Sequence, residues 1–279
     1  SQDYNGSMPI GNGDLAANVW VEPHGDLIFY LSKSDAWSSS QELLKLGRVR
    51  VRLDQPLVRE GGHFTQTLDL KTGTIRIQSA MDSRKTEIHF WIDACHPVVN
   101  VEIKSGSEFS AQVMLEPWRL PGASLYGGAV PDTVLPPENN TIRWYQRNAG
   151  SIYEDTLKNQ NLGHLVGRYP DPLKDLTVGG LISGTAFVSK DATTLVTKEP
   201  VSSLQLRIHA LTARTTAPED WVQQLQTKSS AVEGVAIART REKHEAYWAE
   251  FWNKSWIYIS SRNGPAGGVP WLLMFQPQQ

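Results

Sequence analysis

The sequence predicts a mainly β protein in which two antiparallel layers pack as a sandwich and helices follow. Before residue 217, short segments alternate apolar and polar residues with the period of two that strands produce. Gly, Ser, Asp and Pro turns join these segments at short spacing. After residue 217, apolar residues recur every three to four positions, as in helices. We therefore expect a β body over 1–216, helices and a final strand over 217–259, and an irregular tail over 260–279.

Composition excludes several classes of function. The 279 residues carry a formal net charge of -2 with both signs interspersed, so no basic block predicts a nucleic-acid or anionic membrane surface. The single cysteine, Cys95, cannot form an internal disulfide. No apolar run approaches the length of a membrane span. No nucleotide-binding loop, Ser-His-Asp pattern or spaced metal-ligand cluster is found, so we expect neither cofactor nor metal. Secretion and a periplasmic location both stay open.

The opening stretch, residues 8–37, reads as a β-hairpin with polar ends. Gly11, Asn12 and Gly13 form a tight turn, and two alternating strands over 15–21 and 27–31 follow, joined by a connection at 23–26. Residues 33–37 are polar and end in Trp37, so we expect a loop there. Two polar loops at the ends of a rigid hairpin could frame a sugar-sized pocket. The alternative is a hairpin with ordinary turns.

Further strands follow in close succession. In the predicted strand at 49–53, apolar residues alternate with Arg48, Arg50 and Arg52. The three arginines share one face, which is either solvated or an anion-binding stripe. Residues 87–92 are bulky on both faces, which predicts a strand between two layers. The Pro- and Gly-rich stretch 116–138 predicts a long ordered loop, with disorder as the alternative. The stretch 151–160 is ambiguous, and residues 153–157 could begin a short helix. Residues 163–175 predict a solvated loop rather than a metal site. The other predicted strands cover 64–70, 74–79, 98–103, 109–115, 141–146, 176–182, 185–189, 193–197 and 202–213.

The C-terminal part changes to a helical pattern. Pro218 followed by two acidic residues signals a helix start, and the helical spacing runs from 221 to about 252 with Gly234 as a weak point. A dense aromatic stripe needs a surface to cover it, either the sandwich or a further domain. The stripe consists of His244, Tyr247, Trp248, Phe251 and Trp252.

Ten tryptophans are available for core packing and for stacking on sugars. Most of them should fill the core. Trp37, Trp118 and Trp144 lie beside loop-like sequence, so they are the better candidates for a ligand-facing surface.

Several segments resemble the N-terminal domain of glycoside hydrolase family 95, the α-L-fucosidases and related α-L-galactosidases. The opening Met-Pro-Ile-Gly-Asn-Gly-Asp-Leu-Ala-Ala at 8–17 is similar to the start of that domain, and Ser-Asp-Ala-Trp-Ser at 34–38 to a later segment. Phe-x-Gln-x-Leu-Asp-Leu at 64–70 and the stretch 245–257 also resemble family segments. The resemblance implies a two-layer supersandwich followed by linker helices, and a catalytic α/α barrel beyond them.

The resemblance supplies no catalytic residue, because the family's reactive groups lie in the barrel and nothing after Ile259 resembles it. It implies that Asn12 and Asp14 face the mouth of the barrel and that Trp37 braces them. The alternative is that Asn12 supplies a left-handed turn and Asp14 binds local backbone. The weak ligand-binding candidates are Asn12, Asp14, Asp35, Trp37, Trp118 and Trp144. Spacing pairs no two carboxyls among Glu22, Asp26, Asp35, Glu87, Asp93 and Glu116.

Three hypotheses follow. The first is a non-catalytic N-terminal module of a glycoside hydrolase-like protein, inactive alone, with carbohydrate and the catalytic barrel as partners. The second is a free-standing carbohydrate-binding sandwich that uses exposed tryptophans. The third is a structural or docking module whose aromatic helix covers a partner. Fold alone does not decide among them.

Overall fold

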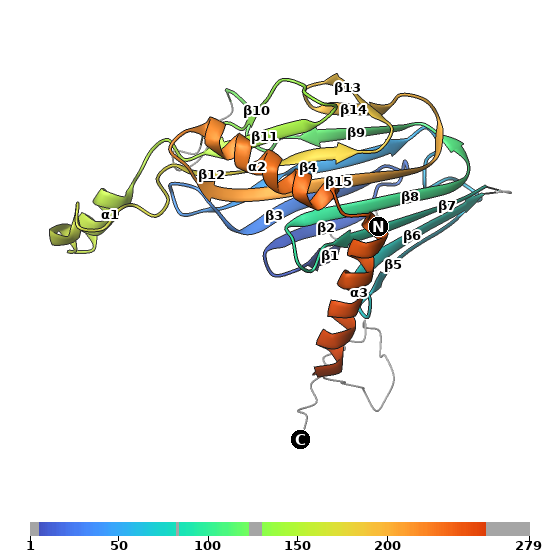
Figure 1. The fold of residues 1–279 in the computed structure, drawn as a ribbon, viewed down its shortest axis with the longest axis horizontal. Coiled ribbons are helices and arrows are strands. Elements are labelled where there is room, and N and C mark those ends of the chain that lie inside the picture. Colours follow the sequence, from blue (N-terminus) through green and yellow to red (C-terminus); the bar gives the residue numbers. More distant parts are fainter. Residues whose placement is uncertain (1–5, 82–83, 123–129, 255–279) are drawn as a thin grey trace.

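Two antiparallel sheets packed face to face form the body of the protein in the computed structural model (Figure 1). The structure describes residues 6–81, 84–122 and 130–254. The predicted mainly β class, with its two layers and C-terminal helices, is confirmed. Among the described helices, none is long and apolar enough to cross a membrane.

The strands divide into a seven-stranded and an eight-stranded sheet, and every neighbouring pair is antiparallel. In spatial order, the seven-stranded sheet contains β1 (Met8–Gly11), β2 (Leu15–Val21), β3 (Leu27–Trp37), β4 (Leu43–Leu53), β9 (Ala111–Glu116), β14 (Thr194–Thr197) and β13 (Phe187–Asp191). The eight-stranded sheet contains β10 (Thr133–Val134), β11 (Ile142–Arg147), β12 (Leu176–Gly184), β15 (Val201–Arg214), β8 (Val98–Phe109), β7 (Arg84–Ile92), β6 (Thr74–Met81) and β5 (His63–Asp69).

One continuous hydrophobic core fills the space between the two sheets. Alternate residues of each strand point into it, as the period-two pattern predicts. Phe29 of β3 and Phe90 of β7 meet edge to face across this core, with ring centroids 5.0 Å apart. Because burying a large apolar side chain contributes about 1.5–3 kcal/mol, this core is the main source of stability.

Two helices cover part of the outer face of the eight-stranded sheet. Trp221 and Leu225 of α2 (Pro218–Glu233) pack on Leu181 and Leu211 of that sheet. His244 of α3 (Ile237–Lys254) stacks on Trp91 of β7, with ring centroids 4.8 Å apart. The bulky residues on both faces of 87–92 therefore lie between two layers, as predicted.

The C-terminal helical region consists of two helices rather than one. The break falls at residues 234–236, where the sequence has its weak point at Gly234. Arg207 of β15 donates to the carbonyls of Val232 and Val235 and so binds the C-terminal end of α2. The second half of α3 extends away from the sheets (Figure 1).

Some expected loops prove to be strands. Residues 33–37 continue β3 because they pair with β2 and β4, and β4 begins at Leu43, six residues ahead of the strand predicted at 49–53. The four-residue β1 is too short to give a periodic signal. The predicted short helix is confirmed as α1 (Tyr153–Asn159), which protrudes from the body with the 3-10 turn η3 (Gly163–Leu165) (Figure 1). The strand expected at 256–259 and the tail at 260–279 lie outside the described residues.

We predict that Gly179→Ala strongly destabilises the fold. A Cβ at residue 179 in β12 would lie 2.1 Å from the carbonyl oxygen of Trp144 in the neighbouring β11. Because that contact is with backbone, the sheet must deform, and the free energy of unfolding should fall by about 2–3 kcal/mol. Gly150→Ala is the control, because nothing lies within 4 Å of its added Cβ. Urea denaturation with equal midpoints for the two variants would contradict the prediction.

Candidate functional site

Asn12 connects the opening turn to the other sheet. Its Oδ1 accepts from the backbone N–H groups of Asp14 at 3.0 Å and Leu15 at 2.8 Å. Its Nδ2 donates to the carbonyl oxygens of Asp93 at 2.7 Å and His96 at 3.0 Å, in the connection between β7 and β8. Asn12 therefore shapes its own turn and also holds one end of the sandwich together.

Lys33 brings two of the predicted carboxylates together. Its Nζ lies 2.6 Å from Asp14 Oδ1 and 2.8 Å from Asp35 Oδ1. The lysine side chain is 6% exposed, whereas those of Asp14 and Asp35 are 43% and 53% exposed. The sequence places Lys33 and Asp35 two residues apart, so an extended β3 presents both on one face. The outcome is a buried cation beneath two carboxylates that remain open to solvent.

A cavity of about 540 Å³ lies beside Lys33 and Asp14. Its other walls come from the connection between β7 and β8, from β15, from α2 and from α3. Apolar side chains such as Val98, Leu211 and Leu225 line it together with the basic side chains of His96, Lys228 and Lys243. Such a mixture of apolar surface and few polar groups is typical of small-molecule sites.

Two further titratable groups border this cavity. Asp93 is buried, accepts from the backbone N–H of Cys95 at 2.8 Å, and lies 3.1 Å from His96 Nδ1. His209 is also buried, with its Nε2 3.3 Å from Glu233 Oε1. Hydrogen bonds to Glu233, that from His209 above all, hold the pKa of this carboxyl below its ordinary value.

The three predicted tryptophans have different environments. Trp37 is 39% exposed at the end of β3, and its carbonyl accepts from Asn148 Nδ2. Trp118 is 46% exposed and lies on the outer side of the seven-stranded sheet, against Tyr30 of β3. Trp144 is only 1% exposed, and its Nε1 donates to the carbonyl of Leu46 at 2.7 Å. The proposal of a sugar-stacking role for Trp144 is therefore wrong in this structure, because the core covers its ring.

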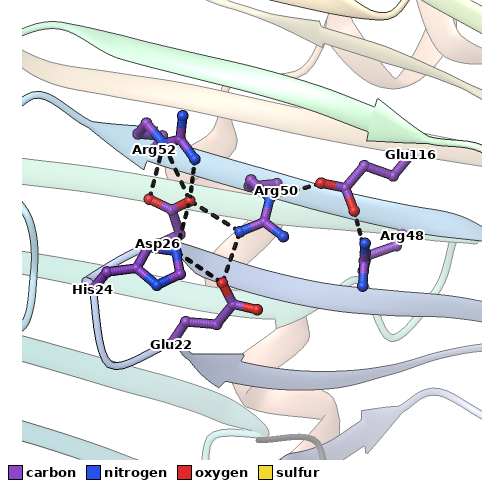
Figure 2. A network of polar contacts seen from close by, with 7 residues as sticks. All are labelled: Glu22, His24, Asp26, Arg48, Arg50, Arg52 and Glu116. Atoms are coloured by element: carbon purple, nitrogen blue, oxygen red, sulfur yellow. Dashed lines mark hydrogen bonds and ion pairs between the residues drawn. The ribbon is translucent and has the colours of Figure 1, made fainter. Parts of the chain in front are cut away.

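The arginine stripe of β4 is not free for an external anion. Arg50 Nη1 lies 2.8 Å from Glu22 Oε2 and 3.0 Å from Asp26 Oδ2, and its Nε donates to Glu116 at 2.7 Å (Figure 2). Arg52 binds Asp26 at 2.9 Å, and Arg48 binds Glu116. The stripe thus connects the β2–β3 turn to β4 and β9.

Glu22, His24 and Asp26 form a cluster whose ligand atoms lie within 4.8 Å of one another (Figure 2). A divalent cation would need these oxygens, but Arg50 donates to both carboxylates and Arg52 to Asp26. The donor set therefore fits an arginine network and not a metal ion.

Comparison with known proteins identifies the family. The family model DUF5703_N, described as "Domain of unknown function (DUF5703)", matches residues 1–257. The chain belongs to this family. No curated protein matches the chain. Among solved structures, this DUF5703 domain is similar to a protein titled "Putative kojibiose phosphorylase from human microbiome", with 10% sequence identity and a TM-score of 0.48. The similarity covers 88% of the DUF5703 chain and 36% of that protein, so the chain spans about a third of its length.

In this DUF5703 domain the structure brings Asn12, Asp14 and Asp35 together, but only Asp14 of the predicted site residues lines the cavity. Sequence reasoning missed Lys33, His96 and His209. The sequence could have indicated Lys33, because Lys33 and Asp35 are two residues apart and so lie on the same face of a strand. His209 had none, because only the pairing of β15 and the packing of α2 bring it to the cavity.

We predict that Asn12→Asp destabilises the domain. An aspartate cannot donate to the carbonyls of Asp93 and His96, and its charge would face two oxygens. The free energy of unfolding should fall by about 2–3 kcal/mol. Asn18→Asp is the matched control, because Asn18 is exposed on β2 and should change stability by less than about 0.5 kcal/mol. Thermal unfolding that affects both variants equally would contradict this role of Asn12.

We predict an acid-dependent contribution from Asp26. Burial raises the pKa of Asp26, but hydrogen bonds from Arg52 and Arg50 outweigh it and hold the pKa below its ordinary value. A depressed pKa stabilises the folded state above about pH 4, and the gain is lost as pH falls through the folded-state pKa. Asp26→Asn should therefore cost about 3 kcal/mol at pH 7. The difference from wild type should shrink below about pH 4.

The matched control is Asp54→Asn, at an exposed aspartate just after β4. Urea denaturation at pH 7 and pH 3 provides the measurement. A cost of Asp26→Asn that is the same at both pH values would show that the charge of Asp26 is not what stabilises the network.

Proposed function

We propose that this DUF5703 domain is a non-catalytic β-sandwich module of a carbohydrate-active protein. One observation carries the proposal: two separate segments that resemble the opening of the family 95 domain, at 8–17 and 34–38, meet on Lys33 beside a cavity. The half-exposed carboxylates of Asp14 and Asp35 can accept hydrogen bonds from sugar hydroxyls. A catalytic barrel, as the resemblance implies, would be the partner that supplies the chemistry.

The ion pairs formed by the carboxyl groups support the proposal that the module is non-catalytic. Glycoside hydrolysis generally needs two carboxyl groups that flank the scissile bond. Asp14 and Asp35 are near each other, but the ammonium of Lys33 binds both and occupies the space between them. All six carboxyls considered from the sequence lie within ion-pair distance of a basic side chain; these are Glu22, Asp26, Asp35, Glu87, Asp93 and Glu116.

We expect the purified chain to bind glycans without cleaving them. The measurements are release of nitrophenol from aryl α-L-fucosides and α-L-galactosides, and binding on a glycan array. Turnover that is lost in Asp35→Asn would contradict the non-catalytic assignment, because it would mean that the Lys33 pair performs the chemistry. A folded chain that binds no saccharide of any kind would contradict the assignment to carbohydrate.

A docking module is the second candidate. The observation that favours it is the half of α3 that extends outward (Figure 1). In this half Tyr247 and Phe251 are each 45% exposed. Trp248 lies between them in sequence and packs on Gly73, so the helix is anchored while these two rings face outward. Light scattering distinguishes this candidate: self-association that is lost in Phe251→Ser would favour docking, and a monomer would favour the first proposal.

A further inference from the structure

A cationic and aromatic surface lies on the outer side of the seven-stranded sheet, away from the Lys33 cavity. We call Tyr30, Lys45, Arg48 and Trp118 the Trp118 surface. The rings of Tyr30 and Trp118 meet edge to face, with centroids 5.4 Å apart and planes at 88°. The Nζ of Lys45 lies 4.3 Å from the centroid of Trp118 and 5.2 Å from that of Tyr30. The surface thus combines two aromatic rings with an exposed ammonium group.

A buried ion pair fixes the position of Trp118. Asp132 accepts from the backbone N–H groups of Trp118 at 3.1 Å and Arg119 at 3.0 Å. The guanidinium of Arg119 binds Asp132 at 2.5 Å and also donates to the carbonyl of Lys45 at 3.0 Å. The side chains of Arg119 and Asp132 are 6% and 0% exposed. A desolvated ion pair is costly, yet here it fixes an exposed tryptophan next to a lysine.

The charge of this face favours an anion. Within the part of the chain that the structure describes, no carboxylate lies within ion-pair distance of Lys45, so its partners are the two rings. Arg48 is bound to Glu116, but its side chain is still 34% exposed. The Trp118 surface and the network of Figure 2 together hold four Lys and Arg side chains, His24 and three carboxylates, although the whole chain has a net charge of -2.

Resting on the assignment to carbohydrate, we propose that the Trp118 surface binds an acidic saccharide. The indole ring of Trp118 stacks on the apolar face of a sugar ring. The ring can do so because Asp132 holds the Trp118 backbone in place while the side chain remains exposed. Lys45, a flexible point charge, leaves the ring and binds a carboxylate or sulfate group of the same saccharide. Arg48 pairs directly with Tyr30 across β3 and β4 and is already bound to Glu116, so it adds positive charge beside this point.

The test is affinity electrophoresis of the full chain in gels that contain polygalacturonate, dextran sulfate or neutral dextran. We expect binding to at least one acidic polymer and weaker binding to dextran. Trp118→Ala should weaken the acidic interaction about tenfold or more, in the range of an interface hot spot. Lys45→Gln should weaken it and reduce its salt dependence, whereas Lys45→Arg should retain both. The carboxylated and sulfated polymers distinguish which anion the surface prefers.

The matched controls are Tyr169→Ala and Arg168→Gln. Tyr169 is 53% exposed, and the guanidinium of Arg168 lies 5.7 Å from its ring centroid, so the pair repeats the ring-and-cation chemistry elsewhere. These variants should bind like wild type. Circular dichroism checks that every variant is folded.

Several results would overturn the proposal. Equal binding of dextran and the acidic polymers would show that the saccharide needs no acidic group. Unchanged binding by Trp118→Ala would show that the Trp118 surface is not the binding site. A loss in the control variants equal to that in Trp118→Ala would indicate non-specific polyanion binding. Binding of neutral glycans that is intact in Trp118→Ala would overturn this surface while leaving the carbohydrate module in place. No binding to any saccharide would overturn both.

Discussion

Burial of the eight-stranded sheet on both faces is the constraint on which the rest of the structure depends. The core covers its inner face, and α2 and α3 cover much of its outer face. A polar group buried there is costly unless it finds a partner inside the protein. This condition explains why Arg207 binds the carbonyls at the end of α2 and why His244 donates to the carbonyl of Gly73. It also explains the close approach of the backbone at Gly179.

Among the described residues, no helix covers the β3–β4–β9 region of the seven-stranded sheet, and polar side chains gather there. The arginines of β4 alternate with apolar residues that face the core, so their charged ends point outward. Arg50 forms the centre of a network that joins the β2–β3 turn to two strands, β4 and β9 (Figure 2). The same face carries Tyr30, Lys45 and Trp118. The outer faces of the two sheets therefore differ: helices pack on that of the eight-stranded sheet, whereas charged and aromatic side chains lie on that of the seven-stranded sheet.

The Lys33 cavity lies where the two sheets meet at one end. Asn12 of the first sheet binds two carbonyls between β7 and β8 of the second, which fixes the edge of the cavity. Lys33 is buried, so its charge requires Asp14 and Asp35 as partners. The positions of both the Lys33 cavity and the Trp118 surface thus follow from the packing of the sheets and of the segments that cover them.

The sequence by itself determined most of the strands, the C-terminal helices and their order along the chain, because alternation, turn residues and helical spacing are local properties. It also indicated that Asn12, Asp14 and Asp35 carry polar chemistry. The tertiary structure alone decided that Trp144 is buried, that Lys33 lies between two carboxylates, and that Lys45 lies over Trp118. The physical reason is that pairing joins strands far apart in sequence, such as β4 and β9, and period two does not say which face of a strand is covered.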